Sequence, residues 1–231
     1  MPDLVQPIDR CPYHSDGRPF HAELITREQL PQEAGINWPD ILLHCGWRRW
    51  GEIFYRPHCP GCQDCIPVRV DCPRFRPRRD QRRCRHRNAD LRLSQHRRSS
   101  DPEHRDLFLR YQQGIHNDHS GDSDLLNDRS PLPSFEIQAR DQSGRLLAVS
   151  ICDCLSDGIS SVYCYYDPEQ RQRSLGTFMI LAEILEAQRL HLRWLYLGFS
   201  VQGCSKMRYK DRFRPQQLWR NGSWEDREPT P

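Results

Sequence analysis

The order of strand and helix patterns in the second half of the chain restricts the fold more than any other feature. Residues 135–140, 146–155 and 160–166 alternate between apolar and polar side chains or run apolar, as strands do, with short glycine-containing turns between them. A polar loop and a helical run over residues 175–190 follow, and residues 194–198 read as one more apolar strand. Three antiparallel strands, a helix and a further strand predict an α+β domain.

The first half shows shorter and less regular patterns. Asn37 and Gly46 bound a short predicted helix, and a strand is predicted over residues 50–55. A second helix is predicted over residues 78–86. A third helix begins at Asp101, where a capping residue precedes proline, and Leu107, Phe108 and Tyr111 give it an apolar face.

The chain has 231 residues, of which 36% are hydrophobic and 28% charged, which is typical of a globular protein with one large or two small cores. Because the composition changes near residue 100, we expect a basic, cysteine-rich domain over residues 1–98 and a second domain over residues 99–231. The sequence shows neither an apolar run long enough for a membrane span nor the pattern of a secretory signal. We therefore expect a cytoplasmic protein with no membrane partner.

Three of the eleven cysteines are closely spaced, as Cys-x2-Cys-x2-Cys at Cys59, Cys62 and Cys65. Their thiolates could converge on one metal ion, with Cys11 or His14 as a remote fourth ligand. The same spacing occurs in iron-sulfur ligation, so the sequence allows either a structural zinc ion or a cluster. The alternative is a group of reduced thiols packed beneath an aromatic strand.

Positive charge is concentrated between residues 69 and 98, where twelve arginines stand against three aspartates. This excess indicates a polyanionic partner, most simply nucleic acid. A helix here would carry successive guanidinium groups along a phosphate backbone. The alternative is a solvated charged surface. The residues that we expect to bind phosphate are Arg78, Arg79, Arg82 and Arg83.

Lys206 and Lys210 are the only lysines among 34 cationic side chains. An ammonium is a compact charge that can lose its proton, whereas guanidinium is a flat and permanently charged fork. The segment that holds both lysines is therefore a candidate for chemistry. Because they are four residues apart, we expect them on one face of either a helix or a strand. Two residual surface lysines are the alternative.

The sequence Ser174-Leu-Gly-Thr177 stands between a predicted strand and the predicted helix over residues 175–190. Free backbone amides and the positive end of the helix dipole would form an anion site there. The same pattern is also typical of an ordinary helix cap.

Three motifs occur in a fixed order along the chain. The first is Tyr55-Arg-Pro-His-Cys with its two further cysteines, the second is Ser161-Val-Tyr-Cys-Tyr-Tyr-Asp-Pro followed by Ser174-Leu-Gly-Thr, and the third is Leu197-Gly-Phe-Ser-Val-Gln-Gly-Cys-Ser-Lys-Met-Arg-Tyr-Lys. Together they resemble the arginyltransferase and leucyltransferase family of aminoacyl-tRNA:protein transferases, and most of all its bacterial aspartate/glutamate leucyltransferase branch. The resemblance extends from about Cys11 to Pro215.

The resemblance implies an N-terminal cysteine-containing domain joined to a GNAT-like acyltransferase domain with a mixed sheet. It implies transfer of an amino acid, leucine in the first instance, from charged tRNA to the N-terminal Asp or Glu of a protein, which marks that protein for N-degron proteolysis. An aminoacyl ester is already activated, so positioning dominates and no cofactor is needed for the chemistry.

The resemblance also implies roles for individual residues. The arginines from Arg78 to Arg83 would bind the acceptor stem, and the 3′-terminal phosphates would lie against Ser174, Leu175, Gly176 and Thr177. Arg48 and Arg49, or Arg79, would face the acidic side chain of the substrate. The expected catalytic residues are Lys206, Tyr209, Lys210, Tyr163 and Asp167.

Two other functions remain open from the sequence. A non-catalytic RNA-binding protein with a cysteine knuckle would explain the arginines and cysteines, but not the second half of the chain. An acetyltransferase that uses acetyl-CoA would suit the strand-loop-helix unit, but not the arginines. The sequence does not decide between leucine and arginine as the transferred amino acid.

Overall fold

The computed structural model describes residues 5–127 and 129–228. The chain forms two compact units, and the division falls inside strand β10. The first unit comprises residues 1–71 and 196–231, and the second comprises residues 72–195. The boundary that we predicted between residues 98 and 99 lies inside the second unit. As a boundary between separately folding domains it stays a prediction.

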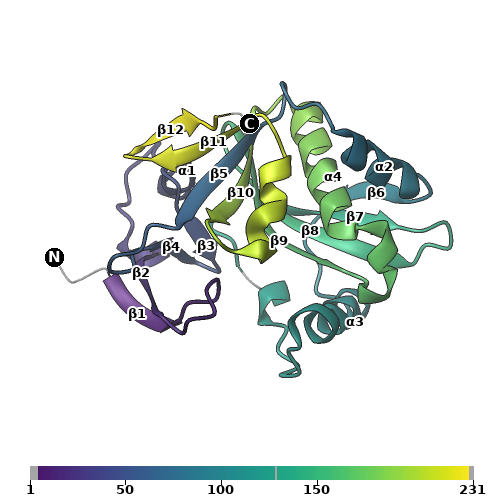
Figure 1. Cartoon of the computed structure of the whole chain (residues 1–231), viewed down its shortest axis with the longest axis horizontal. Coiled ribbons are helices and arrows are strands. Elements are labelled where there is room, and N and C mark those ends of the chain that lie inside the picture. The colour runs from purple at the N-terminus through teal and green to yellow at the C-terminus, as the bar shows by residue number, and fades with distance from the viewer. Residues whose placement is uncertain (1–4, 128, 229–231) are drawn as a thin grey trace. The chain divides into compact units, whose positions relative to one another are not determined.

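The first unit contains two antiparallel ladders and one α-helix (Figure 1). One ladder has the order β1 (Val5–Arg10), β2 (Pro19–Thr26), β4 (Ile53–Pro57) and β3 (Arg48–Trp50). The strands β12 (Ser223–Asp226), β11 (Gln216–Arg220), β5 (Cys65–Asp71) and β10 (Trp194–Val201) are neighbours in that order. The helical segments of this unit are η1 (Arg27–Gln29), α1 (Trp38–His44) and η5 (Ser205–Arg212).

Helix α1 confirms the first predicted helix, and the Asn37 side chain accepts a hydrogen bond from the Asp40 amide at 3.4 Å. The single strand predicted over residues 50–55 is wrong. Trp50 pairs with Ile53 across a two-residue turn, so this segment belongs to the hairpin of β3 and β4. Gly51 has φ +61°, the left-handed conformation that such turns require.

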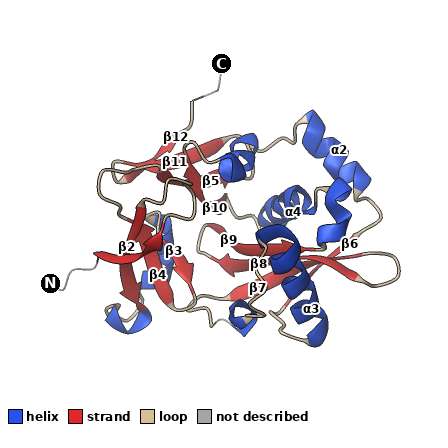
Figure 2. Ribbon diagram, turned by 60° about the horizontal axis from the view of Figure 1, so that its bottom comes forward, coloured by secondary structure: helices blue, strands red, loops and turns tan. Residues whose placement is uncertain are grey.

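The second unit is an antiparallel sheet with helices packed on it (Figure 2). Its strands have the order β9 (Gly158–Tyr166), β8 (Leu146–Cys154), β7 (Ser134–Arg140) and β6 (Arg92–His96). Its helices are α2 (Arg79–Arg87), α3 (Pro102–Tyr111) and α4 (Leu175–Arg189), with the shorter turns η2 (Gln112–His116), η3 (Asp124–Asn127) and η4 (Pro168–Arg173). The predicted strands and helices of this half are confirmed, and so is the α+β class.

Helices α3 and α4 cover opposite faces of this sheet. Strand β8 directs Val149 and Ile151 into the cluster that contains Leu107 and Phe108 of α3. The alternate residue Ser150 instead donates a hydrogen bond to Glu183 of α4. Since successive side chains of a strand point to opposite faces, the two helices lie on the two sides of β8. The apolar face predicted for α3 is thus confirmed as part of the core.

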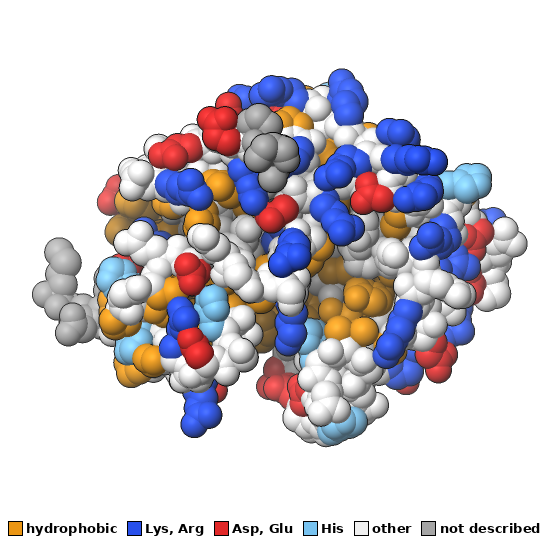
Figure 3. Space-filling model, in the orientation of Figure 1, with side chains coloured by type: hydrophobic (Ala, Val, Ile, Leu, Met, Phe, Trp, Pro, Cys, Tyr) orange, Lys and Arg blue, Asp and Glu red, His pale blue; other side chains and the backbone are white. Residues whose placement is uncertain are grey.

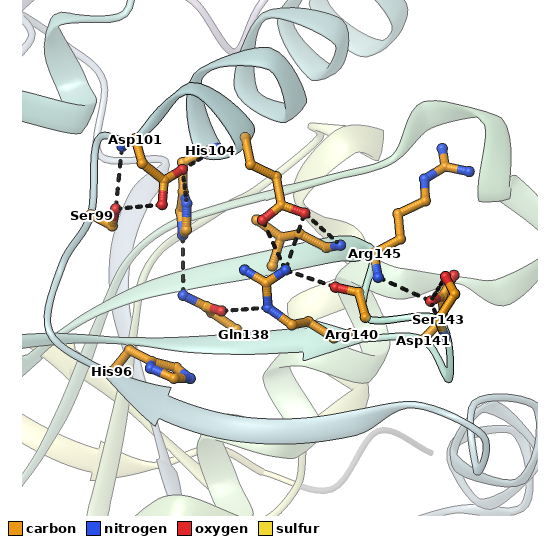
Figure 4. A network of polar contacts seen from close by, with 12 residues as sticks. His96, Ser99, Asp101, His104, Gln138, Arg140, Asp141, Ser143 and Arg145 are labelled. Carbon is orange, nitrogen blue, oxygen red and sulfur yellow. Dashed lines mark hydrogen bonds and ion pairs between the residues drawn. The ribbon is translucent and has the colours of Figure 1, made fainter.

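A buried ionic network joins the start of α3 to β7 (Figure 4). His104 Nδ1 lies 2.8 Å from Asp101 Oδ1, and His104 Nε2 lies 2.8 Å from Glu136 Oε1. Gln138 Nε2 donates to the same Glu136 oxygen at 2.6 Å. Two carboxylates facing the two ring nitrogens favour a proton on each nitrogen, and so favour the imidazolium form of His104.

Replacing His104 with glutamine is expected to lower the unfolding temperature most at pH 4 to 6.5. Burial disfavours the His104 charge, but the hydrogen bonds that His104 donates to Glu136 and Asp101 outweigh it and raise the His104 pKa above 6.5. The ion pair therefore stabilises the fold fully below pH 6.5 and is lost as pH rises through the raised pKa. Breaking a buried pair costs about 3 kcal/mol.

Thermal unfolding of the His104→Gln protein between pH 4 and pH 9 checks this expectation. His96→Gln, which changes an exposed histidine of β6, is the matched control. If the unfolding temperatures of the parent and the His104→Gln protein differ by the same amount from pH 4 to pH 9, His104 is neutral in the folded protein.

Candidate functional site

The two lysines lie in a short 3₁₀ helix, η5, that follows the end of β10. The chain turns into it through Gly203, at φ +79°, and a hydrogen bond from the Cys204 amide to the Val201 carbonyl. A 3₁₀ helix has three residues per turn, so residues four apart point in different directions. Lys206 is exposed and Lys210 is buried. The expectation that both lysines share one face is therefore wrong.

Lys210 is 7% exposed and lies against β10. Its Nζ donates a hydrogen bond to the Phe199 carbonyl at 2.7 Å, and its own carbonyl accepts one from Gln216 Nε2 at 3.0 Å. Burial and the positive charge of Arg48 lower the Lys210 pKa from 10.5 to about 7. Lys210 can thus gain or lose a proton at neutral pH. Tyr209 is 41% exposed, and its ring centre lies 5.9 Å from Lys210 Nζ.

Arg48 occupies the space over the backbone of Gly198. A Cβ atom at residue 198 would lie 3.2 Å from Arg48 Nε, and Gly198 has φ +78°. Both conditions favour glycine in this strand. Arg48 is 9% exposed and Arg49 is 4% exposed, and Arg49 Nη1 donates to the Gly51 carbonyl at 3.1 Å. The structure brings Arg48 next to Lys210, while the predicted contact of Arg48 and Arg49 with an acidic substrate stays a prediction.

Tyr163 and Asp167 lie in the second unit, on and just after β9. The Tyr163 hydroxyl donates to Gln112 Oε1 at 3.0 Å, and burial raises the Tyr163 pKa well above its usual value. Asp167 is fully buried between Arg110 at 3.2 Å and Arg145 at 2.5 Å. Both carboxylate oxygens of Asp167 are engaged in these ion pairs, and the catalytic role expected for Tyr163 and Asp167 stays a prediction.

Helix α2 carries the predicted phosphate-binding arginines on its exposed face. Gln81, Cys84 and Asn88 are buried, whereas the four arginines point away from the core. Arg78 is the N-cap residue, and Arg79, Arg82 and Arg83 follow it in the first turns. Figure 3 shows Lys and Arg side chains gathered over α2. The predicted helix and its charged face are thus confirmed as structure.

The buried face of α2 holds the segment that leads into α4. Asn88 Nδ2 donates to the Arg173 carbonyl at 2.9 Å, and Cys84 Sγ lies 3.6 Å from the Ser174 carbonyl oxygen. An ion pair of 2.9 Å joins Arg173 to Asp90 just after α2. Helix α2 and the predicted anion-binding segment therefore lie next to each other, in contact through the buried face of the helix, whereas the four predicted phosphate-binding arginines lie on its exposed face.

In the predicted anion-binding segment, Ser174 to Thr177, the side chains and the backbone amides have different surroundings. Ser174 adopts a left-handed conformation at φ +55° and does not cap α4 with its side chain. Leu175 is buried in the core, and a Cβ atom on Gly176 would lie 3.2 Å from the Tyr166 ring. Anion binding at Leu175, Gly176 and Thr177 would therefore use their amides, which begin α4.

The potential metal ligands that converge in the described ranges 5–127 and 129–228 are His14, Cys62 and Asp64. One ligand atom from each lies within 4.8 Å of the others. The predicted ligands were Cys59, Cys62 and Cys65 with Cys11 or His14, and of these Cys62 and His14 belong to this group. Asp64 was missed by the sequence reasoning, although its position between two of the closely spaced cysteines is a usable signal.

The other closely spaced cysteines, Cys59 and Cys65, have different surroundings from Cys62. Cys59 Sγ accepts a hydrogen bond from the His21 amide at 3.4 Å. Burial and the neighbouring Cys11 and Cys59 raise the Cys65 pKa to about 12. Arg18 Nη1 lies 3.7 Å from Cys62 Sγ and 3.8 Å from Asp64 Oδ2. Nitrogen, sulfur and oxygen donors suit zinc better than a cluster held by four thiolates.

Two family models cover most of the chain. The model described as "Arginine-tRNA-protein transferase, N terminus" matches residues 9–83, and that described as "Arginine-tRNA-protein transferase, C terminus" matches residues 103–220. The chain belongs to this family. An aspartate/glutamate leucyltransferase of Pseudomonas putida (strain W619) is 42% identical over 193 residues, covering 79% of this chain and 80% of that protein.

A second relative of the same name, from Pseudomonas aeruginosa (strain LESB58), is 40% identical over the same length, with the same coverage of both chains. Family membership makes the protein an aminoacyltransferase. A solved structure of L-PGS from Bacillus licheniformis, at 9% identity and a TM-score of 0.49 over 61% of this chain and 47% of that one, is too distant to support an argument. Among residues 5–127 and 129–228, no helix combines the length and apolarity needed to cross a membrane.

Proposed function

We propose that this protein transfers leucine from leucyl-tRNA to the α-amino group of proteins that begin with Asp or Glu, in the cytoplasm, and so creates an N-degron. Two named relatives with 42% and 40% identity support the choice of amino acid and acceptor. The observation that carries an enzymatic function is the match of the two family models to residues 9–83 and 103–220, and the buried Lys210, whose pKa burial and Arg48 lower to about 7, supplies a candidate proton acceptor. An RNA-binding protein without activity would need only exposed, permanently charged groups.

The reaction needs no redox step. The uncharged α-amine attacks the ester carbonyl carbon, a C–N bond forms, and the C–O bond to the tRNA ribose breaks. The attacking nitrogen loses a proton and the departing ribose oxygen gains one, so atoms and charge balance. A lysine that titrates at neutral pH suits the uptake and return of that proton. We assign this role to Lys210, with the exposed Lys206 and Tyr209 next to the ester.

The tRNA would lie along the second unit. The exposed arginines of α2 would contact phosphates of the acceptor stem, and the amides of Leu175, Gly176 and Thr177 would face the 3′-terminal phosphates. Support comes from the hydrogen bonds that join the buried face of α2 to Arg173 and Ser174. These contacts hold α2 and the start of α4, the two predicted phosphate-binding elements, against each other.

A zinc ion in this protein would be structural. His14, Cys62 and Asp64 would hold it, and the metal would join the loop between β1 and β2 to the loop between β4 and β5. Acyl transfer from an ester requires no chemistry from the ion.

The proposed function predicts label transfer from leucyl-tRNA to a peptide that begins with Asp or Glu. Purified protein is incubated separately with radiolabelled leucyl-tRNA and arginyl-tRNA, each with peptides beginning with Asp, Glu or Ala. Label from leucyl-tRNA should appear in the Asp and Glu peptides and not in the Ala peptide. Transfer of label from arginyl-tRNA alone would show that the transferred amino acid is arginine and not leucine. Binding of tRNA without any transfer would favour the RNA-binding alternative.

A further inference from the structure

A cavity of about 570 Å³ opens in the first unit at the end of β10. Its walls come from the turn after β10, from η5, and from the hairpin of β11 and β12. Its volume is in the range of small-molecule sites and is enough for the first one or two residues of a peptide. The same 3₁₀ helix that carries Lys210 therefore forms one wall of a cavity.

The cavity is lined by charges of both signs. Four carboxylates face it, from Asp211, Glu225, Asp226 and Glu228, together with the guanidinium groups of Arg208, Arg220 and Arg227. A pocket for phosphate would not place four carboxylates around the ligand, because each would repel the anion. A ligand that carries both a positive and a negative group fits this lining.

Some of these charges neutralise one another and form a fixed part of the wall. Arg227 Nη1 donates to Asp211 Oδ1 at 2.6 Å, and the Ser200 hydroxyl donates to the same oxygen at 3.3 Å. Gln217 Nε2 donates to Asp226 Oδ1 at 3.0 Å. These contacts hold η5 and the hairpin together, so the cavity exists before a ligand arrives.

Other charges in the lining are available to a ligand. Within the part of the chain that the structure describes, the side chains of Arg208, Arg220 and Glu225 make no hydrogen bond or ion pair. Together Arg208 and Arg220 match one carboxylate, and the carboxylates of Glu225 and Glu228 in the same cavity match one ammonium. The N-terminal residue of a protein that begins with Asp or Glu carries both groups, with the ammonium on Cα and the carboxylate on Cβ in Asp or on Cγ in Glu.

We infer that this cavity binds the acidic N-terminal residue of the acceptor protein, with its side-chain carboxylate on Arg208 and Arg220 and its α-ammonium on Glu225. The inference rests on the proposed function. Arg48 and Arg49, which the sequence suggested for this contact, are buried, whereas Arg208 and Arg220 are exposed in the cavity wall. Arg208 belongs to the same 3₁₀ helix as Lys210, the proposed proton acceptor.

Direct peptide binding tests the cavity without tRNA. A fluorescent tetrapeptide beginning with Asp is titrated into the full-length protein, together with an Asn-initiated peptide that lacks the charge and an N-acetylated Asp peptide that lacks the ammonium. The Asp peptide should bind at least about tenfold more tightly than either analogue, because charged hydrogen bonds are lost in both. Equal affinity for the three peptides would overturn the inference.

The variants Arg208→Gln and Arg220→Gln locate the binding site. Each should raise the KM for the Asp peptide about tenfold, with kcat and tRNA affinity nearly unchanged, and Arg220→Lys should restore part of the loss. Arg10→Gln, on the exposed strand β1, is the matched control. An unchanged KM in the Arg208→Gln, Arg220→Gln double variant would show that the cavity does not bind the substrate, and it would not contradict the proposed function. If the protein transfers no amino acid but binds the peptide in a way that depends on both arginines, the cavity is the peptide-binding site and the proposed function is wrong.

Discussion

Replacing Lys210 with methionine is expected to lower kcat/KM by roughly 100-fold or more, the usual size of a lost acid-base group, and to make the protein more heat-stable at pH 7 and below. Methionine has nearly the same length and no charge, so it occupies the same space against β10. The hydrogen bond from Lys210 Nζ to the Phe199 carbonyl is lost, which costs about 1 kcal/mol. The cost of burying the ammonium, on the order of a few kcal/mol, is removed at the same time.

The direction of the stability effect follows from the Lys210 pKa. The unfolded chain keeps the proton up to about pH 10.5, whereas the folded protein releases it near pH 7. Folding therefore releases a proton between these two values, and stability rises with pH across that window. Below pH 7 both states are charged, so the full cost of burial is present. The gain from Lys210→Met is largest there and disappears towards pH 10.5.

Two measurements check this prediction. Thermal unfolding from pH 6 to pH 10 should show a flatter pH dependence for Lys210→Met than for the parent, and the pH profile of kcat/KM should lose an inflection near pH 7. Lys206→Met, which changes the exposed lysine, is the control for stability. A Lys210→Arg protein that transfers at the parental rate would rule out proton uptake, since arginine does not titrate in this range.

Replacing Arg78, Arg79, Arg82 and Arg83 with alanine is expected to reduce tRNA affinity by several orders of magnitude at low salt. Each phosphate contact that is lost should lower the slope of log affinity against log salt by roughly 0.7 to 0.9. Alanine is a good helix former and these side chains lie outside the core, so α2 should stay folded. Filter binding of tRNA at several salt concentrations measures both quantities.

The matched control carries lysine at the same four positions. Lysine keeps the charge that neutralises phosphate, so this variant should retain the salt slope of the parent. A slope that is unchanged in the alanine variant would show that the α2 arginines form an ordinary solvated surface. A slope that falls in both variants would point to paired guanidinium contacts rather than to charge alone.

Elements specified by neighbouring residues were predictable. Helix α4 and strands β7, β8 and β9 follow apolar patterns that lie within each segment, so periodicity was enough to find them. The exposed arginines of α2 were found for the same reason, because a charged helical face is a local pattern. The strands β1, β2, β5, β11 and β12 were missed. The pairing of β5 with β11 is distant, as when Leu218 pairs with Val68, and no local signal encodes such a partner. The hairpin of β11 and β12 was missed although Asn221 and Gly222, both with positive φ, form a local turn signal between them.

In the candidate site, too, some properties follow from the sequence and others only from the tertiary structure. The sequence by itself determined which chemical groups are present, including two lysines, a group of closely spaced cysteines and a run of arginines. Only the tertiary structure decided that Lys210 is buried beside Arg48 while Lys206 is exposed, that Asp64 joins His14 and Cys62, and that Arg220 and Glu225 line a cavity with Arg208. The physical reason is that burial and neighbouring charge set a pKa or create a binding site, and both depend on segments that are far apart in the sequence.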